Sequence, residues 1–154
     1  MQYLEDFSPG MTFRSGPSRI GADEIRRFAA EFDPQPFHLD DEAARATMFQ
    51  GLAASGWHTA AVTMKLLVGS DFKPAAGIIG VGFDELRWPK PVRPGDELHV
   101  EGEILETRAS RSNPRQGLIK VRTSTFNQHG EAVQISVGNL VVPRRQNEES
   151  RSTN

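Results

Sequence analysis

The chain has 154 residues, 37% of them hydrophobic, and its 18 Lys and Arg against 20 Asp and Glu give a formal net charge of -2 at pH 7. This length is typical of one domain with a proper core, and the absence of a basic surplus argues against a nucleic-acid or anionic-membrane partner. With no cysteine, no secretion signal in MQYLEDFSPG and no apolar run near the ~18 residues that cross a bilayer, we expect a soluble cytoplasmic protein whose partner is small or another protein.

The first half of the chain carries helical patterns. Residues 23–32 place acids in a first turn and apolar side chains at helical spacing, which predicts a short amphipathic helix. The DPQP segment that follows, residues 33–36, should run extended because prolines disfavour helix at the residues before them. Asp40 or Asp41 then caps a second predicted helix over 42–49.

A third helix is predicted over residues 55–69, with a serine cap, a glycine stop and a broad apolar stripe. At ~1.5 Å per residue it is about 20 Å long, enough to cross a small domain. We therefore expect it to be the central helix of the fold.

The second half alternates apolar and polar residues between turn-forming segments. Four strand-like runs stand there, at 78–88, 97–107, 117–126 and 132–142. They predict an antiparallel meander with one face exposed to solvent. A further strand over 11–20 is expected to join this sheet, and the central helix is expected to cover its apolar face. The predicted class is α+β, one domain over 1–143, followed by a polar structureless tail over 144–154.

Asp33 and His38 are the candidate reactive groups. A carboxylate and an imidazole can together hold and deprotonate a water around neutral pH. The two prolines between them restrict the backbone of the segment that carries both side chains. An aspartate at a helix end and a lone histidine are also common structural features. These two residues alone therefore do not distinguish a catalytic pair from a structural one, and the wider pattern of the surrounding sequence has to be considered.

That wider pattern resembles the MaoC-like dehydratases, also called (R)-specific enoyl-CoA hydratases. Their motif is Asp, any residue, Asn, Pro, an apolar residue and His, then an acidic helix start, a Phe and a Gly-initiated helix. Here it reads Asp33 to His38, then LDDE, Phe49 and Ser55-Gly56. The resemblance continues through DELRWPKPVRPGDEL and spans residues 7–142.

The resemblance implies a hot-dog fold, a long helix wrapped by a curved antiparallel sheet of about five strands, and a homodimer joined edge to edge. It also implies hydration of an enoyl thioester, or the reverse dehydration, with coenzyme A as the expected carrier and no metal or other cofactor. Asp33 and His38 would grip one water, and the backbone N–H of Gly56 would meet the thioester oxygen.

Two departures from the family motif concern the substrate more than the reaction. Gln35 replaces the usual Asn and is one methylene longer, and Ser55 replaces a His. Gln35, Phe37, Ser55 and Trp57 are the candidate substrate-binding residues, although Trp57, at helical spacing with Met64 and Leu67, is most simply a core residue. His58, two residues inside the helix, is expected to be packed or solvent-facing, and the acids after His38 are expected to be helix caps and not metal ligands.

Two basic groups are candidate contacts for the phosphates of coenzyme A. One comprises Arg87, Lys90 and Arg93, and the other comprises Arg108, Arg111 and Arg115. Surface solubility explains these charges equally well.

Two other functions remain open on the sequence. A thioesterase of the hot-dog class needs a carboxylate on the central helix, and none stands between residues 55 and 69. A non-catalytic acyl-thioester-binding or partner subunit with the same fold ranks lower, because both reactive residue types are present.

Overall fold

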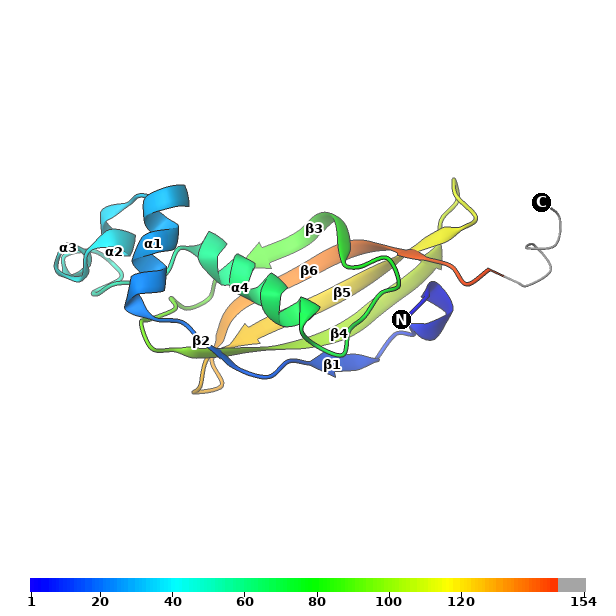
Figure 1. Cartoon of the computed structure of the whole chain (residues 1–154), viewed down its shortest axis with the longest axis horizontal. Coiled ribbons are helices and arrows are strands. Elements are labelled where there is room, and N and C mark those ends of the chain that lie inside the picture. The colour runs from blue at the N-terminus through cyan, green and yellow to red at the C-terminus, as the bar shows by residue number, and fades with distance from the viewer. Residues whose placement is uncertain (147–154) are drawn as a thin grey trace.

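The computed structural model describes residues 1–146 and has the expected α+β composition, with one long helix lying across a curved antiparallel sheet (Figure 1). Its elements in chain order are η1 (Leu4–Asp6), β1 (Thr12–Arg14), β2 (Ser18–Arg19), α1 (Ala22–Phe32), α2 (Pro36–Leu39), α3 (Asp41–Arg45), α4 (Gly56–Val68), β3 (Ile79–Arg87), β4 (Glu97–Ala109), β5 (Gln116–Phe126) and β6 (Ala132–Pro143).

The sheet has the strand order β1-β4-β5-β6-β3, and β2 pairs separately with β4. The predicted meander is therefore correct for β4, β5 and β6 and wrong for β3, which pairs with β6 and places Phe83 opposite Gly138. Burial alternates along β4 and β5, whereas residues 79–84 of β3 are all exposed. Alternation in the sequence sets which side chains share a face and does not encode which strand pairs with which. The segment after β3 instead carries the chain across the end of the sheet to β4.

The strand predicted over 11–20 is broken into β1 and β2, which both pair with β4. Between them, Ser15 bonds to Val100 through its backbone N–H and through its hydroxyl oxygen, which accepts from the Val100 N–H. Gly16 and Pro17 follow, and proline has no N–H to donate to a ladder. The break therefore keeps the edge attached while the chain bends around the sheet.

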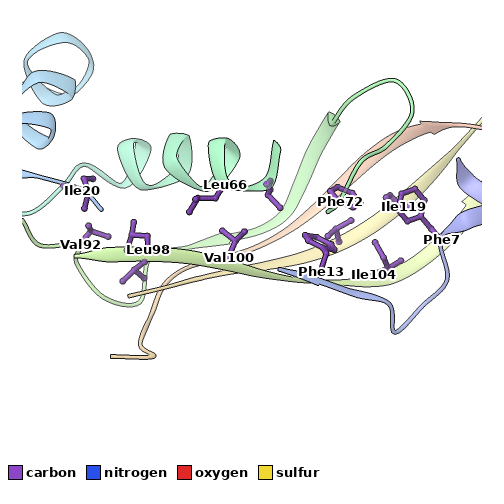
Figure 2. Packing of buried hydrophobic residues seen from close by; sticks show 14 of the residues in the cluster. Phe7, Phe13, Ile20, Leu66, Phe72, Val92, Leu98, Val100, Ile104 and Ile119 are labelled. Carbon is purple, nitrogen blue, oxygen red and sulfur yellow. The ribbon is translucent and has the colours of Figure 1, made fainter. Parts of the chain in front are cut away.

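The core lies between α4 and the inner face of the sheet (Figure 2). Leu66 of α4 lies above Leu98 and Val100 of β4, whose side chains are fully buried. Toward the other end, the Phe13 ring stacks on Phe72 with ring centroids 4.4 Å apart. Phe13 fits because the opposite residue is Gly102, where a Cβ would come within 2.0 Å of the ring.

Helices α1 and α4 form where the sequence predicts them, and Ser55 caps α4 by accepting the N–H of Trp57 at 3.2 Å. Two local predictions are wrong. The extended segment ends at Gln35, because Pro36 takes the first position of the unpredicted helix α2, where its missing N–H costs nothing. The helix predicted over 42–49 is α3 and stops at Arg45, because Thr47 bonds back to the carbonyl of Ala44.

The two ends of the described chain meet beyond the end of the sheet that lies opposite α1, α2 and α3 (Figure 1). Arg144 pairs with Glu5 at 3.2 Å and Arg145 with Asp6 at 2.7 Å, so the first residues after β6 dock on η1. The rest of the predicted tail, residues 147–154, lies outside the described residues. Among residues 1–146 no helix is long and apolar enough to span a membrane.

Candidate active site

The structure brings Asp33 and His38 together. Asp33 caps the C-terminus of α1 and His38 lies in α2, so the two groups sit on adjacent helices that meet at Pro34 and Gln35. Nε2 of His38 lies 3.3 Å from Oδ2 of Asp33, and the side chains are 6% and 16% exposed. Both side chains are therefore largely shielded from solvent, and the carboxylate is the more accessible of the two.

A backbone carbonyl fixes which nitrogen of His38 faces Asp33. Nδ1 of His38 lies 2.6 Å from the carbonyl oxygen of Ala53, and a carbonyl can only accept, so Nδ1 carries the hydrogen. Nε2 and the ionised carboxylate are then both acceptors, and they cannot bond to each other without a shared proton. Either one proton lies between them or one water donates a hydrogen to each. This is the arrangement that a water-activating pair requires.

Hydrogen bonds keep Asp33 ionised despite its partial burial. Burial raises the pKa of Asp33, but bonds from the Gln35 and Ser55 side chains and the charge of His38 outweigh it, and the pKa lies below its ordinary value. The amide nitrogen of Gln35 donates to Oδ1. Asp33 is therefore present as a carboxylate, able to accept a proton, at neutral pH.

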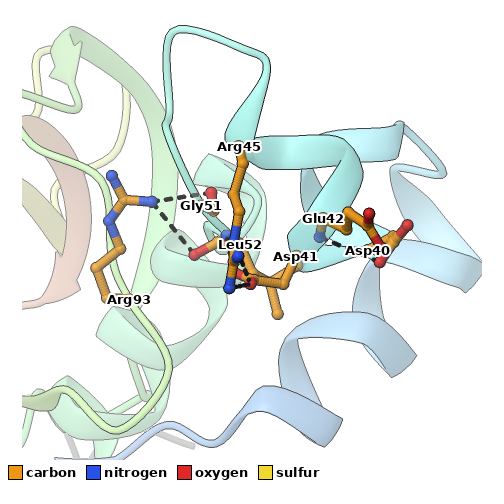
Figure 3. A network of polar contacts seen from close by, with 7 residues as sticks. All are labelled: Asp40, Asp41, Glu42, Arg45, Gly51, Leu52 and Arg93. Atoms are coloured by element: carbon orange, nitrogen blue, oxygen red, sulfur yellow. Dashed lines mark hydrogen bonds and ion pairs between the residues drawn. The ribbon is translucent and has the colours of Figure 1, made fainter.

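The loop that carries Ala53 is held by Arg93. Its guanidinium donates to the carbonyls of Gly51, at 2.9 Å, and Phe49. Figure 3 shows the guanidinium bonded to the carbonyls of Gly51 and Leu52. On the opposite side of the loop, Asp41 accepts the N–H of Leu52 at 2.9 Å. Arg93, one of the candidate phosphate contacts, thus donates its hydrogen bonds to loop carbonyls.

Gly56 begins α4 beside the pair, where free N–H groups and the positive end of the helix dipole gather. Among residues 1–146 no acceptor takes the Gly56 N–H. A side chain at this position has no room, because a Cβ would lie 2.8 Å from two atoms of the Trp88 ring. Glycine is required here for contact with Trp88, a reason the sequence did not reveal.

A cavity of about 350 Å³ opens between these elements. Its lining includes His38, Gly56, Thr59, Trp88 and Val92. It joins the imidazole, the start of α4 and the segment between β3 and β4. Trp88 is the largest of the wall residues that sequence reasoning missed, since the residue directly after a strand carries no motif of its own.

The four residues predicted to bind substrate take different positions around this cavity. Gln35 holds Asp33, and Phe37 packs edge-on against His38 with ring centroids 4.6 Å apart. Ser55 is fully buried as the cap of α4, and Trp57 is 59% exposed with its ring against Trp88. None of the four lines the cavity directly. Gln35 and Ser55 instead form hydrogen bonds with Asp33, and Phe37 packs against the ring of His38.

The other predicted groups lie elsewhere or are paired. Arg87 pairs with Glu85 and Lys90 with Glu131. The hairpin between β4 and β5, which carries the second basic group, lies at the end of the sheet opposite α1, α2 and α3 (Figure 1). His58 is buried and stacks on Phe28 with ring centroids 4.6 Å apart.

These features define a hot-dog domain with an acid and an imidazole paired beside the start of its central helix. The MaoC-like domain family matches residues 6–126. The protein YdeM of Bacillus subtilis is 36% identical over 139 residues, which cover 90% of this chain and 96% of YdeM. The chain belongs to the MaoC-like family.

Solved structures agree with this assignment. The MaoC-like dehydratase from Rhodospirillum rubrum is 54% identical, with a TM-score of 0.92 over 96% of this chain and 100% of that one. The (R)-hydratase PhaJ1 from Pseudomonas aeruginosa is 28% identical, with a TM-score of 0.71 over 93% of this chain and 86% of that one. The chain is similar to both over nearly its whole length.

Proposed function

We propose that the protein adds water to an enoyl thioester, or removes it from a 3-hydroxyacyl thioester, with coenzyme A as the expected carrier. The observation that carries this proposal is the pair of facing acceptors, Nε2 of His38 and Oδ2 of Asp33, beside the Gly56 N–H, which no acceptor within residues 1–146 takes. The dehydratase and (R)-hydratase names of the two solved relatives support it.

The proton balance of the hydration is simple. The oxygen of a water held by Asp33 and His38 forms a bond to the β-carbon while the pair takes one of its protons. The electron pair of the double bond moves toward the thioester oxygen, which the N–H of Gly56 stabilises by roughly 3 kcal/mol. The pair then returns a proton to the α-carbon, and no metal or redox cofactor takes part.

A second copy of this chain is the expected partner. Within the described part of the chain, β3 is an edge strand that pairs only with β6, and its Ile79, Val81 and Phe83 are 45%, 61% and 64% exposed. Met64 of α4 shares a cavity wall with Phe83, so the exposed apolar faces of helix and strand adjoin. A free edge flanked by apolar side chains favours pairing with another strand.

The dimer is tested by light scattering after size exclusion. Val81→Lys places a charge on the edge and is expected to give a monomer, whereas Met11→Lys, at another exposed apolar position, leaves a dimer. A wild-type monomer at micromolar concentration would remove the dimer from the proposal.

The reaction is tested with crotonyl-CoA and longer enoyl-CoAs, by following loss of the conjugated double bond. Asp33→Asn and His38→Ala are expected to lower kcat by about 10²- to 10⁴-fold. Asp40→Asn and His129→Ala, matched changes at the α3 cap and in the turn after β5, should leave kcat within about threefold. Wild-type rates in both site variants would refute the mechanism, and release of free thiol would indicate a thioesterase instead.

A further inference from the structure

Trp88 is fixed in place by three neighbours. The face of its indole lies against Gly56, and the ring of Trp57 meets it edge-on with centroids 5.3 Å apart. Its Nε1 donates to Oε1 of Gln134 at 2.9 Å, and Gln134 is only 3% exposed. Trp88 is 39% exposed and its bond to Gln134 is partly buried, so packing on one side and this bond together restrict rotation of the indole.

Gln134 belongs to a polar layer that crosses the core beneath α4. The layer consists of the buried residues Thr63, Thr125 and Gln134, with Trp88 at its outer end. The hydroxyls of Thr63 and Thr125 bond to each other at 2.7 Å, and Thr125 lies opposite Gln134 in the β5–β6 ladder. The Thr63 hydroxyl also bonds to the carbonyl of Thr59 at 2.9 Å, and Gln134 bonds to Trp88, so displacing the layer would break buried Thr63–Thr125 and partly buried Gln134–Trp88 contacts.

A second cavity, of about 260 Å³, lies beyond this layer. Met64 and Leu67 of α4 line it, together with Ser136, Gly138 and Leu140 of β6. Along α4 the order is Gly56 and Thr59 at the first cavity, then Thr63 in the layer, then Met64 and Leu67 at the second. Along β6 the order is Gln134 and then Ser136, so the layer separates the two cavities on both elements.

We propose that Trp88, anchored by Gln134, is a specificity-determining residue that restricts the protein to short acyl groups. The proposal rests on the function proposed above, which places the thioester oxygen at Gly56. An acyl chain that extends inward from Gly56 meets the Trp88 indole and the polar layer before it reaches the apolar second cavity. Short chains end before the layer, and long chains must displace it.

The test measures binding by calorimetry with saturated thioesters, which do not react. Each methylene moved from water into an apolar cavity strengthens binding about fourfold. Wild-type protein is expected to bind octanoyl-CoA less than about threefold more tightly than butyryl-CoA, because the added methylenes do not reach the second cavity. Trp88→Ala opens the path and is expected to raise that ratio above about tenfold.

Two further variants keep the test decisive if Trp88→Ala does not fold. Trp88→Phe keeps a ring on Gly56 but loses the bond to Gln134, and Gln134→Leu removes that anchor together with one polar member of the layer. Both are expected to raise the ratio at least about threefold. Phe126→Ala, an aromatic truncation on the outer face beside His99, should leave it unchanged. A wild-type ratio above about threefold, or folded variants with the wild-type ratio, would overturn the inference.

The same samples separate this inference from the reaction. If the protein binds short thioesters with the expected ratios but hydrates none, the reaction is refuted and the specificity stands. If it hydrates crotonyl-CoA and octenoyl-CoA equally well, the reaction stands and the specificity is refuted. If it binds no acyl thioester, both fail.

Discussion

The carbonyl oxygen of Ala53 lies 2.6 Å from Nδ1 of His38 and thereby determines that Nε2 faces Asp33. The geometry of the pair therefore depends on the loop before α4 as much as on the proline-flanked segment that carries both side chains. Arg93, which holds that loop by its carbonyls, becomes a positioning residue that touches neither member of the pair.

Replacing Arg93 by lysine keeps the charge and loses the planar fork that reaches several carbonyls at once. We expect Arg93→Lys to lower the free energy of unfolding by about 1–3 kcal/mol and to lower kcat, with KM for the thioester changed less. Urea denaturation and steady-state kinetics measure the two effects. Arg87→Lys, at an exposed residue paired with Glu85, is the control. A rise in KM alone would indicate that Arg93 contacts the coenzyme A phosphates.

Gly56→Ala should fail for steric reasons, because the added Cβ would lie 2.8 Å from the Trp88 ring. We expect a loss of about 1–3 kcal/mol in the free energy of unfolding and a shift in tryptophan fluorescence as the indole moves. Gly16→Ala is the matched control, since nothing lies within 4 Å of a Cβ there, and it should change stability by less than about 0.5 kcal/mol. Equal stability of the two variants would contradict the close packing of Gly56 and Trp88.

The low pKa of Asp33 depends on its hydrogen-bond donors, so Gln35→Leu is expected to raise it. A carboxyl whose folded pKa is depressed stabilises the fold above its unfolded pKa of about 3.9, and this contribution is lost as the pH falls through the folded value. In Gln35→Leu this contribution is smaller and its loss is complete at a higher pH, and the acidic limb of kcat/KM also moves to higher pH. Carbon-detected NMR titration of the carboxyl measures the shift. An unchanged titration would show that Gln35 does not hold Asp33 in solution.

His58 should make the protein sensitive to mild acid. Burial lowers the pKa of His58 more than Glu24 raises it, and among the described residues its Nδ1 has no hydrogen-bond partner. The unfolded chain therefore binds more protons as the pH falls below about 6.5, and stability falls with it.

His58→Phe keeps the stack on Phe28 and removes the proton acceptor. We expect its free energy of unfolding to vary less than that of wild type between about pH 7 and pH 5. His129→Gln, in the turn after β5, should keep the wild-type slope. Parallel urea curves at both pH values test this, and identical slopes for wild type and His58→Phe would refute it.

Local patterns predicted much of this fold. Acids in a first turn, a serine cap and a glycine stop identified α1 and α4, and alternation identified the long strands. The pairing of β3 with β6 was missed because it depends on which apolar faces meet across the whole domain. The short helix α2 was missed because proline at a first helical position resembles proline in an extended segment.

Part of the candidate site could also be predicted from local sequence. Asp33 and His38 lie in one short segment, so their spacing in the sequence identifies them as a possible pair. Ala53, Trp88 and Arg93 reach the site from two other segments, through a carbonyl, a packed ring and a guanidinium. None of these contacts leaves a periodicity or a spacing in the sequence, because each depends on how α4 and the sheet come together.

The docking of Arg144 and Arg145 on Glu5 and Asp6 has a practical consequence for handling the protein. Residues near both ends of the described chain share one pole of the molecule, and α1 and α2, which flank Asp33, lie at the other (Figure 1). Affinity tags, dyes or surface linkers attached there leave the entrance to the cavity unobstructed. Immobilised samples are therefore suitable for measuring thioester binding.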